Sequence, residues 1–496
     1  MLAKLGAHRL PRHTELALGI VAAVAIGAIA PFGNETVLLA LLLVVIVVGT
    51  TMAPEVVPAI LLVGPAVLHT LTYIWSGFAT RGDVLANPLA YSPLLAVLFG
   101  PALVATVLWR RPALNELPFA RSRVAPALIF GMILLQLLLA VRLVGTPSPI
   151  YGITKTAGFL AFSLLPALYV LLVVRNALDA KRVFNAMMVV GGSWLALLIG
   201  LAFIRGNFDF YHANFGQVLG GSNEAAGGIG ARAGILLIVA LSSVLAGSNK
   251  TRLLGFMVLP LAATALILSG HRDSLFATSA GVVVLLFMLL FWMRGPQWIR
   301  PGKLWIAAAS TCVVVLLGGW VVSLASSGVF GPRYQDPFSS ESFAARQHVQ
   351  QIALDAWSTS PILGHGTGSS AHFIGGMDQP KLGVINGIYP HNVTIELLLE
   401  LGVIGATIYV VTVTEVSRRA ARLLWRAGNS SWPVAALLAL FVQAFVASQG
   451  GADLTLQNDL WIIGAVLGAA AVAAGSERPL QRVLSRQPAR AASQIL

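Results

Sequence analysis

Long apolar runs recur along almost the whole chain, and their lengths are those of membrane spans. A helix needs about 20 mostly apolar residues to cross the hydrocarbon core of a bilayer. The pattern therefore predicts an all-α, polytopic membrane protein with about 14 transmembrane helices (12–14). The predicted spans are residues 16–32, 36–53, 55–75, 89–109, 124–144, 156–174, 186–204, 228–246, 253–269, 275–293, 304–325, 393–413, 432–449 and 457–474.

One polar stretch, residues 326–392, interrupts this pattern and is too long to be a simple connection. Loops of that length in compact proteins are usually functional or disordered, and its aromatic residues argue against disorder. Its middle has a helical pattern, which predicts a helix over about 341–357 that opens after the serines of "FSSES" and ends at the proline and glycines of "STSPILGHGTG". The chain thus divides into eleven spans in residues 1–325, this loop, and three spans with a basic tail in residues 393–496.

Charge adds an orientation to this picture. Only 10% of the residues are charged, against 57% hydrophobic, and the net charge is +13. Most of the lysines and arginines fall in alternate connections and in both terminal segments, which places both termini in the cytoplasm and residues 326–392 on the opposite face. The basic excess therefore anchors topology and does not predict nucleic-acid binding. The first span could belong to a cleaved signal peptide, but a retained signal-anchor fits the even number of spans better.

The predicted loop helix carries an arginine on its apolar face. At 100° per residue, Arg346 falls within the apolar arc that includes Phe343 and Ala353, whereas His348 and Asp355 lie on the opposite side. A guanidinium on the buried face of a helix requires an anion or a carboxylate beside it.

A second group of polar residues stands where the loop ends and the next span begins. His391 precedes Asn392, a suitable N-cap for the span from Val393. The positive end of that helix disfavours an imidazolium, so His391 is either a neutral capping residue or a proton acceptor. Glu396 and Glu400 share one face of the first turns. A salt bridge to an arginine of the outer surface is favoured over a substrate contact for this pair.

Arg272 lies in the tight hairpin "LILSGHRDSLFATSAG", on the side that the positive-inside rule depletes of arginine. Asp273 and Ser274 are expected to cap the helix that follows, which is the alternative, purely structural explanation of the hairpin. Together, Arg272, Arg346 and His391 suit a diphosphate ester, because arginines bind phosphate oxygens in pairs and histidine accepts a proton from an attacking hydroxyl.

The remaining candidates are weaker. Asn223 and Glu224 open the eighth span and are expected to cap it, and Arg205, Tyr211 and His212 share the preceding outer connection, where they are candidates for contacts with sugar or phosphate. We find no HExxH or Asp-rich metal motif, no P-loop and no GxGxxG after a strand. The sequence therefore predicts no metal, no cofactor and no nucleotide-sugar donor.

Several of these segments occur in the order typical of one family. "ALDAWSTSPILGHGTGSS", "PHNVTIELLLELGVIG", the hairpin around Arg272 and "SNEAAGG" resemble the core of the O-antigen ligase and O-antigen polymerase superfamily over about residues 215–410. The chain departs from that pattern at His271 and Asp273, where small residues are usual. The resemblance implies a GT-C-like, inverting, metal-independent glycosyltransferase.

The resemblance also implies the substrates and the roles of single residues. The donor is expected to be a glycan on a polyprenyl diphosphate, with its diphosphate held by Arg272 and Arg346. His391 is expected to act as base or to orient the acceptor hydroxyl. Asn223, Glu224, Asn392, Glu396 and Glu400, with the three residues of the preceding connection, are expected to support or contact the substrates.

Two questions remain open at this stage. The acceptor is expected to be a lipid A core or similar anchor for a ligase, and the growing glycan for a polymerase; the single large outer loop favours a ligase. A transporter or flippase of lipid-linked glycans is the alternative from another functional class. The expected location is the bacterial inner membrane, among its lipids, with the active site on the periplasmic side.

Overall fold

The computed structural model describes residues 57–63, 122–174, 177–205, 223–289, 341–376, 389–427, 432–451, 454 and 458–484. These residues form helices and their connections, and no strand occurs among them. The predicted spans 16–32, 36–53, 89–109 and 304–325, with most of 55–75, lie outside the described residues, so the predicted number of spans stays a prediction. Residues 57–63 form one short helix.

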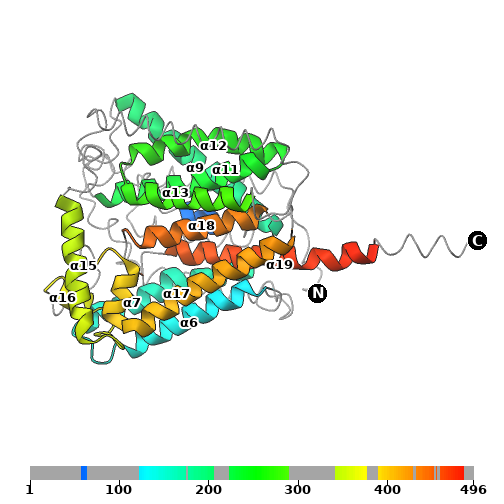
Figure 1. Ribbon diagram of the computed structural model, residues 1–496. Coiled ribbons are helices and arrows are strands. Elements are labelled where there is room, and N and C mark those ends of the chain that lie inside the picture. Colours follow the sequence, from blue (N-terminus) through cyan, green and yellow to red (C-terminus); the bar gives the residue numbers. More distant parts are fainter. Residues whose placement is uncertain are drawn as a thin grey trace, which may run out of the picture.

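The elements from residue 124 onward follow one another as in Figure 1. They are α6 (Val124–Val141), α7 (Pro149–Phe159), a π-helical turn (Leu160–Leu164), α8 (Leu165–Val173), α9 (Ala177–Arg205), α11 (Asn223–Ala246), α12 (Asn249–Leu268), α13 (Arg272–Phe287), α15 (Glu341–Thr359), α16 (Ser370–Phe373), α17 (Val393–Ala427), α18 (Trp432–Ser448) and α19 (Asn458–Leu484).

Six helical segments in the described part of the chain are long and apolar enough to cross a membrane: Val124–Val141, Pro149–Val173, Leu178–Leu201, Gly228–Ala246, Asn249–Leu268 and Val393–Trp425. Shorter apolar helices cover Trp432–Ser448 and Asn458–Val472. The all-helical membrane architecture predicted from the apolar pattern is therefore confirmed for these residues. Several boundaries differ from the prediction: the spans predicted over 186–204 and 393–413 cover Leu178–Leu201 and Val393–Trp425. The span predicted to start at residue 156 begins at Pro149, so its first turns carry Lys155 within the helix.

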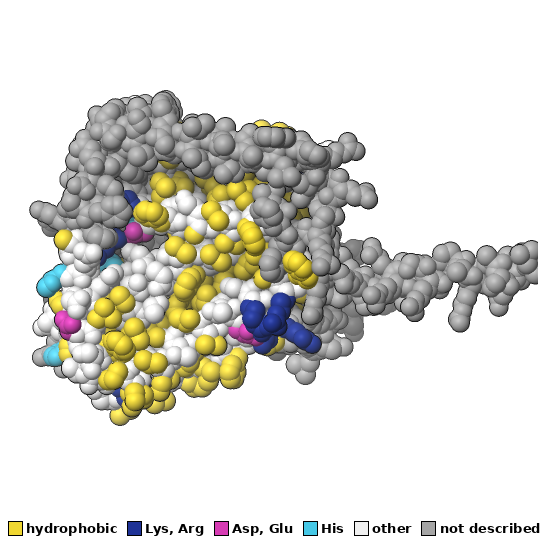
Figure 2. All heavy atoms as spheres, viewed as in Figure 1, with side chains coloured by type: hydrophobic (Ala, Val, Ile, Leu, Met, Phe, Trp, Pro, Cys, Tyr) yellow, Lys and Arg dark blue, Asp and Glu magenta, His cyan; other side chains and the backbone are white. Residues whose placement is uncertain are grey.

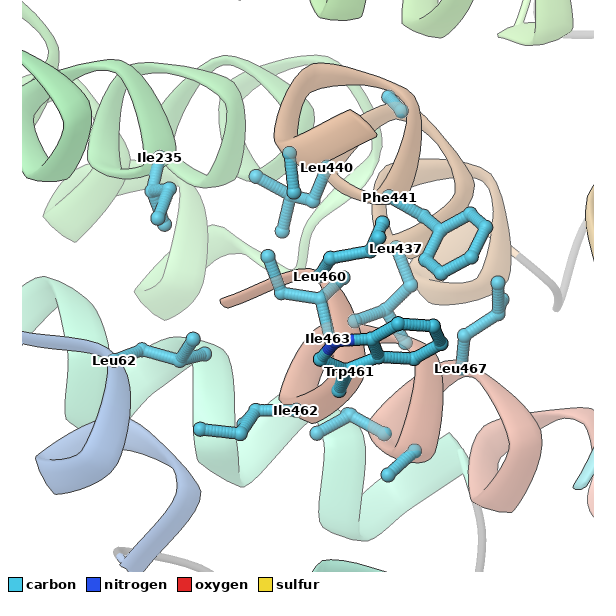
Figure 3. Close-up of a cluster of buried hydrophobic side chains, with 14 of the residues drawn as sticks. Leu62, Ile235, Leu437, Leu440, Phe441, Leu460, Trp461, Ile462, Ile463 and Leu467 are labelled. Atoms are coloured by element: carbon cyan, nitrogen blue, oxygen red, sulfur yellow. The ribbon is translucent and has the colours of Figure 1, made fainter. Parts of the chain in front are cut away.

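The apolar core lies between helices that are far apart in the sequence. Trp461 of α19 is fully buried and meets the ring of Phe159 edge-on, with ring centroids 5.7 Å apart. Leu437 and Phe441 of α18 belong to the same buried cluster as Trp461 and Leu467 of α19 (Figure 3). Packing of this kind fixes how the helices sit against one another, and it therefore fixes where their polar ends meet.

Two ends of the helical bundle differ in character. The helix α15 lies across one end, at the left in Figure 1, at a steep angle to the long helices. At the other end, dark blue side chains gather over the C-terminal part of α17 in Figure 2. There Arg419 donates to a carboxylate oxygen of Glu415 at 2.6 Å and to the carbonyl of Arg123 at 2.5 Å. Between the two ends, the described face in Figure 2 carries patches of apolar side chains.

The helix α17 breaks at Gly402, and the glycine-rich turn after α15 fills the break. Gly402 has φ 67° and ψ −166°, a conformation essentially confined to glycine. The amide of Val403 donates to the carbonyl of Pro361 at 2.9 Å. In return, the amides of His365 and Gly366 donate to the carbonyls of Leu399 and Glu400, each at 2.9 Å.

This exchange gives partners to the amide of Val403 and to the carbonyls of Leu399 and Glu400 beside the break, as buried backbone groups require. The same turn is held from the other side, because Arg142 at the end of α6 donates to the carbonyl of Gly364 at 2.9 Å. The turn therefore locks α15 and its side chains to the end of the bundle.

Candidate active site

Arg346 reaches from α15 to the bundle, as its place on the helical wheel predicts. Its Nη1 donates to Oδ2 of Asp273 at 2.6 Å and to the carbonyl oxygen of Gly450 at 3.0 Å. Asp273 stands in the first turn of α13, and Gly450 follows α18. The guanidinium thus connects α15 to α13 and to the residues after α18. The side chain of Arg346 remains 32% exposed.

The hairpin between α12 and α13 places its polar residues at this same end. It turns through Gly270, which has φ 62°. Contrary to the sequence prediction, neither Asp273 nor Ser274 is the cap of α13: His271 is the N-cap, and its Nδ1 accepts from the amide of Ser274 at 3.3 Å. The hydroxyl of Ser274 lies 2.8 Å from the same nitrogen. The carboxylate of Asp273 is left for Arg346.

Arg272 is the first residue of α13. A helix N-terminus carries a partial positive charge and favours anions. A cation at this position therefore adds to a field that already attracts negative charge. Arg272 is partly buried and stands directly beside Asp273, at the end of the bundle that α15 covers.

His391 has an unusual backbone and an unpartnered ring nitrogen. Its φ of 54° is the only positive value at a non-glycine residue in the described part of the chain, and such strain is typical of functional sites. Its Nδ1 is buried and has no hydrogen-bond partner among the described residues. The ring packs against Tyr389, with centroids 4.5 Å apart. A polar atom left unpaired in this way is available to a bound molecule.

The residue after the histidine performs the predicted capping. The side-chain oxygen of Asn392 accepts from the amide of Ile395 at 3.1 Å, and its amide group donates to the carbonyl of Gln449 at 3.2 Å. Asn392 thereby joins the start of α17 to the end of α18, next to the carbonyl that holds Arg346. The substrate contact also predicted for Asn392 stays a prediction.

The surroundings of both histidines favour the neutral form that a base requires. Burial, with a smaller effect of the Arg346 guanidinium, lowers the pKa of His391 to about 4, and the carboxylate of Asp273 opposes that shift. Burial also lowers the pKa of His271, although Asp273 raises it. Because Arg346 and Asp273 act on both rings, the four side chains form one electrostatic group.

Glu396 and Glu400 form the salt bridge predicted for them, but with a different partner. Both are bound by the ammonium of Lys155 in α7 and not by an arginine; the Nζ–Oε1 distance to Glu400 is 2.7 Å. All three side chains are 1% exposed. Ser370 also donates to Glu400 at 2.7 Å, and Glu396 accepts from the amide of Leu454 at 3.1 Å. Enclosed in this way, the two carboxylates hold protein segments together. The substrate contact also predicted for them stays a prediction.

The sequence contained a sign of this cluster that was missed. Lys155 is a charged residue in the apolar segment Pro149–Val173, and charged residues within a span usually face a partner. The predicted span started at residue 156, so Lys155 fell in a connection, where a lysine needs no buried partner. Gly450 was missed for another reason: a backbone carbonyl gives no sequence pattern at all.

The roles predicted for the other site residues stay predictions. Arg205 ends α9, and Asn223 and Glu224 begin α11, but their side chains lie outside what the structure describes, as do Tyr211 and His212. In the described part of the chain no three histidine, cysteine or acidic residues are placed to hold a metal ion.

The geometry of Arg272, Arg346 and His391 lies within a segment that matches a known family. Residues 256–410 match the family model of the O-antigen ligase. This match supports the O-antigen ligase superfamily. The matched segment runs from within α12 to a point in α17 beyond the break at Gly402, and it contains the hairpin, α15, the glycine-rich turn and the start of α17. No curated protein matches the chain.

The match of residues 256–410 confirms the resemblance inferred from the sequence motifs. Together with the apolar helices, this match supports a membrane glycosyltransferase of the ligase or polymerase type. For such a family the general partners are a lipid-linked glycan and a glycan acceptor.

Proposed function

We propose that the protein transfers a glycan from a polyprenyl diphosphate donor to an acceptor hydroxyl, in a site formed by Arg346, Arg272 and His391. One observation carries the proposal. The partly exposed guanidinium of Arg346 lies close enough to the imidazole of His391 to lower its pKa, and Nδ1 of that imidazole has no partner among the described residues. A lipid diphosphate has its anionic group at the surface of the bilayer and its chain within it, so it suits a site at the ends of spanning helices.

The proposed reaction is a single displacement at the anomeric carbon. The acceptor oxygen forms a bond to this carbon while the bond from the carbon to the diphosphate oxygen breaks, and the polyprenyl diphosphate leaves with the electron pair. Arg346 and Arg272 stabilise the negative charge that develops on the leaving group. His391 takes the proton of the acceptor hydroxyl.

Donor binding strengthens the base in this scheme. Burial and, to a lesser extent, the guanidinium of Arg346 lower the pKa of His391. A bound diphosphate neutralises that guanidinium and brings negative charge near the ring, which favours the protonated form of the imidazole. His391 therefore becomes a better proton acceptor when the donor is present.

The distribution of charge supports a site on the periplasmic face of the inner membrane. Arg418, Arg419 and Arg422 gather near the end of α17 that lies away from α15 (Figure 2), and clustered arginines favour the cytoplasmic side. The N-terminus of α17, with His391 before it, then faces the periplasm.

We favour a ligase over a polymerase, as the single large outer loop predicted from the sequence suggests. The product distinguishes the two, because a ligase attaches one glycan to each acceptor and a polymerase makes chains longer than the glycan of the donor. A flippase is the competing function. It predicts that donor moves across proteoliposomes without any transfer of glycan.

The substitution Arg346→Lys tests the proposal. Lysine keeps the charge but lacks the fork that binds two phosphate oxygens, so we expect kcat/KM for transfer to fall about 100-fold. Arg182→Lys, in an ion pair at the start of α9, is the matched control and should transfer at the wild-type rate. Equal rates for wild type and Arg346→Lys would reject the role of Arg346.

A further inference from the structure

Two hydrogen-bond acceptors outside the predicted site bind one nitrogen of the Arg346 guanidinium, Nη1. The carboxylate of Asp273 and the carbonyl of Gly450 both accept from Nη1, at 2.6 and 3.0 Å. Among the described residues, Nε and Nη2 donate to no acceptor. These two nitrogens form the edge through which arginine binds two oxygens of one phosphate.

From this arrangement we infer that Asp273 and the Gly450 carbonyl are positioning groups, which pin Nη1 so that the Nε–Nη2 edge of Arg346 is presented to the diphosphate of the donor. The inference rests on the proposed function and deepens it. It also gives a role to Asp273, a residue that departs from the family pattern at a position where a small residue is usual.

The burial of the pair agrees with positioning and not with simple packing. Asp273 is 25% exposed and Arg346 32% exposed, so a ligand at the surface can reach the guanidinium. An exposed ion pair alone holds a long side chain only weakly. The second acceptor, a backbone carbonyl fixed at the end of α18, is what restricts the guanidinium to one orientation.

The neighbours of Asp273 hold its carboxylate in place. Nε2 of His271 lies 3.9 Å from Oδ2, the oxygen that binds Arg346. His271 is itself fixed as the N-cap of α13. On the other side, Gly450 packs so closely that a Cβ added there would lie 3.0 Å from Cβ and from Cγ of Asp273. The carboxylate has little room to move away from the guanidinium.

This close packing provides a pair of variants that removes no polar group. Gly450→Ala should push Asp273 away from Arg346, because 3.0 Å is shorter than a normal contact between carbon atoms. Gly451→Ala is the matched control, since the nearest atoms to its new Cβ are 3.6 and 4.0 Å away. Asp273→Ala removes the acceptor altogether, and Asp273→Asn keeps an oxygen acceptor while removing the charge.

The experiment measures the protection of Arg346 by inorganic diphosphate. The full-length protein in proteoliposomes is treated with phenylglyoxal, with and without diphosphate, and modification is quantified by mass spectrometry of the peptide that contains Arg346. We expect the half-protecting concentration to rise about 10-fold in Asp273→Ala and Gly450→Ala, the effect of one lost charge-assisted hydrogen bond. Asp273→Asn should fall between these variants and the wild type, and Gly451→Ala should equal the wild type.

Three outcomes would overturn the inference. Equal protection in all variants would show that Arg346 needs no positioning. Protection at lower concentrations in Asp273→Ala would show that the carboxylate competes with the ligand. A loss of protection in Gly451→Ala as large as in Gly450→Ala would make the effect unspecific. Because protection requires no transfer, a wild type that transfers no glycan would reject the proposed function and leave this result standing by itself.

Discussion

Lys155 and Glu400 are joined by a buried ion pair of 2.7 Å between residues 245 positions apart in the sequence. Glu396 binds the same ammonium. The cluster ties α7 to the first turns of α17, just inside the bundle from His391. It gives a partner to the two acidic residues in the first turns of α17 and explains why the helix tolerates them there.

We expect Lys155→Met to destabilise the protein strongly, because it leaves two buried carboxylates without their cation. Breaking a buried ion pair costs about 3–5 kcal/mol. Thermal unfolding in detergent measures the effect, with Lys250→Met as control, since Lys250 is exposed. Adding Glu396→Gln and Glu400→Gln to Lys155→Met should recover part of the loss. A melting temperature unchanged by Lys155→Met would contradict the structural role of the cluster.

The exchange of hydrogen bonds at Gly402 leads to a second prediction. Gly402→Ala adds a Cβ that meets the carbonyl of Ile362 and forces alanine into a conformation essentially confined to glycine. We expect a loss of at least about 3 kcal/mol of stability. Gly376→Ala is the control: its φ is +60°, but nothing lies within 4 Å of the new Cβ.

The control separates backbone strain from steric conflict. Gly376→Ala should cost only about 1–2 kcal/mol, the penalty of a left-handed conformation. Equal losses in the two variants, measured by chemical denaturation, would show that the turn after α15 does not depend on close approach to α17.

The pH dependence of transfer follows from the environment of His391. Burial and the Arg346 guanidinium lower its pKa to about 4, so the free protein carries neutral imidazole well below pH 6.5. The acid limb of kcat/KM, which reports groups of the free enzyme, is therefore expected near pH 4.

The same shift has a consequence for stability. Between pH 6.5 and pH 4 the unfolded chain binds more protons at His391 than the folded protein, so lowering the pH through this window reduces stability. His348→Asn, on the exposed side of α15, is expected to leave both profiles unchanged. An acid limb near pH 6.5 would mean that His391 titrates as in water.

The parts of the site that could be predicted are those determined by local sequence. The predicted bounds of α15 agree with the observed bounds within two residues, because a helical pattern, capping serines and a proline lie next to one another in the chain. The orientation of Arg346 and the capping by Asn392 follow from helix periodicity and from one side chain close to a helix start.

The parts that could not be predicted depend on contacts between distant segments. Lys155 meets Glu400, and Arg346 meets Gly450, across more than 100 residues. No local pattern specifies such pairs. The predicted cap of α13 was wrong because Asp and Ser are the usual capping residues. Here the carboxylate of Asp273 binds Arg346 instead, and the imidazole of His271 caps the helix.

The most direct test of the central claim is the rate of glycan transfer in the variant His391→Gly. Glycine accepts the positive φ of this position without strain, so the variant should fold and insert like the wild type. Removal of the base should lower kcat about 100-fold to 10,000-fold, measured with a lipid diphosphate donor in proteoliposomes at matched protein amounts. Transfer by His391→Gly at the wild-type rate would contradict the account.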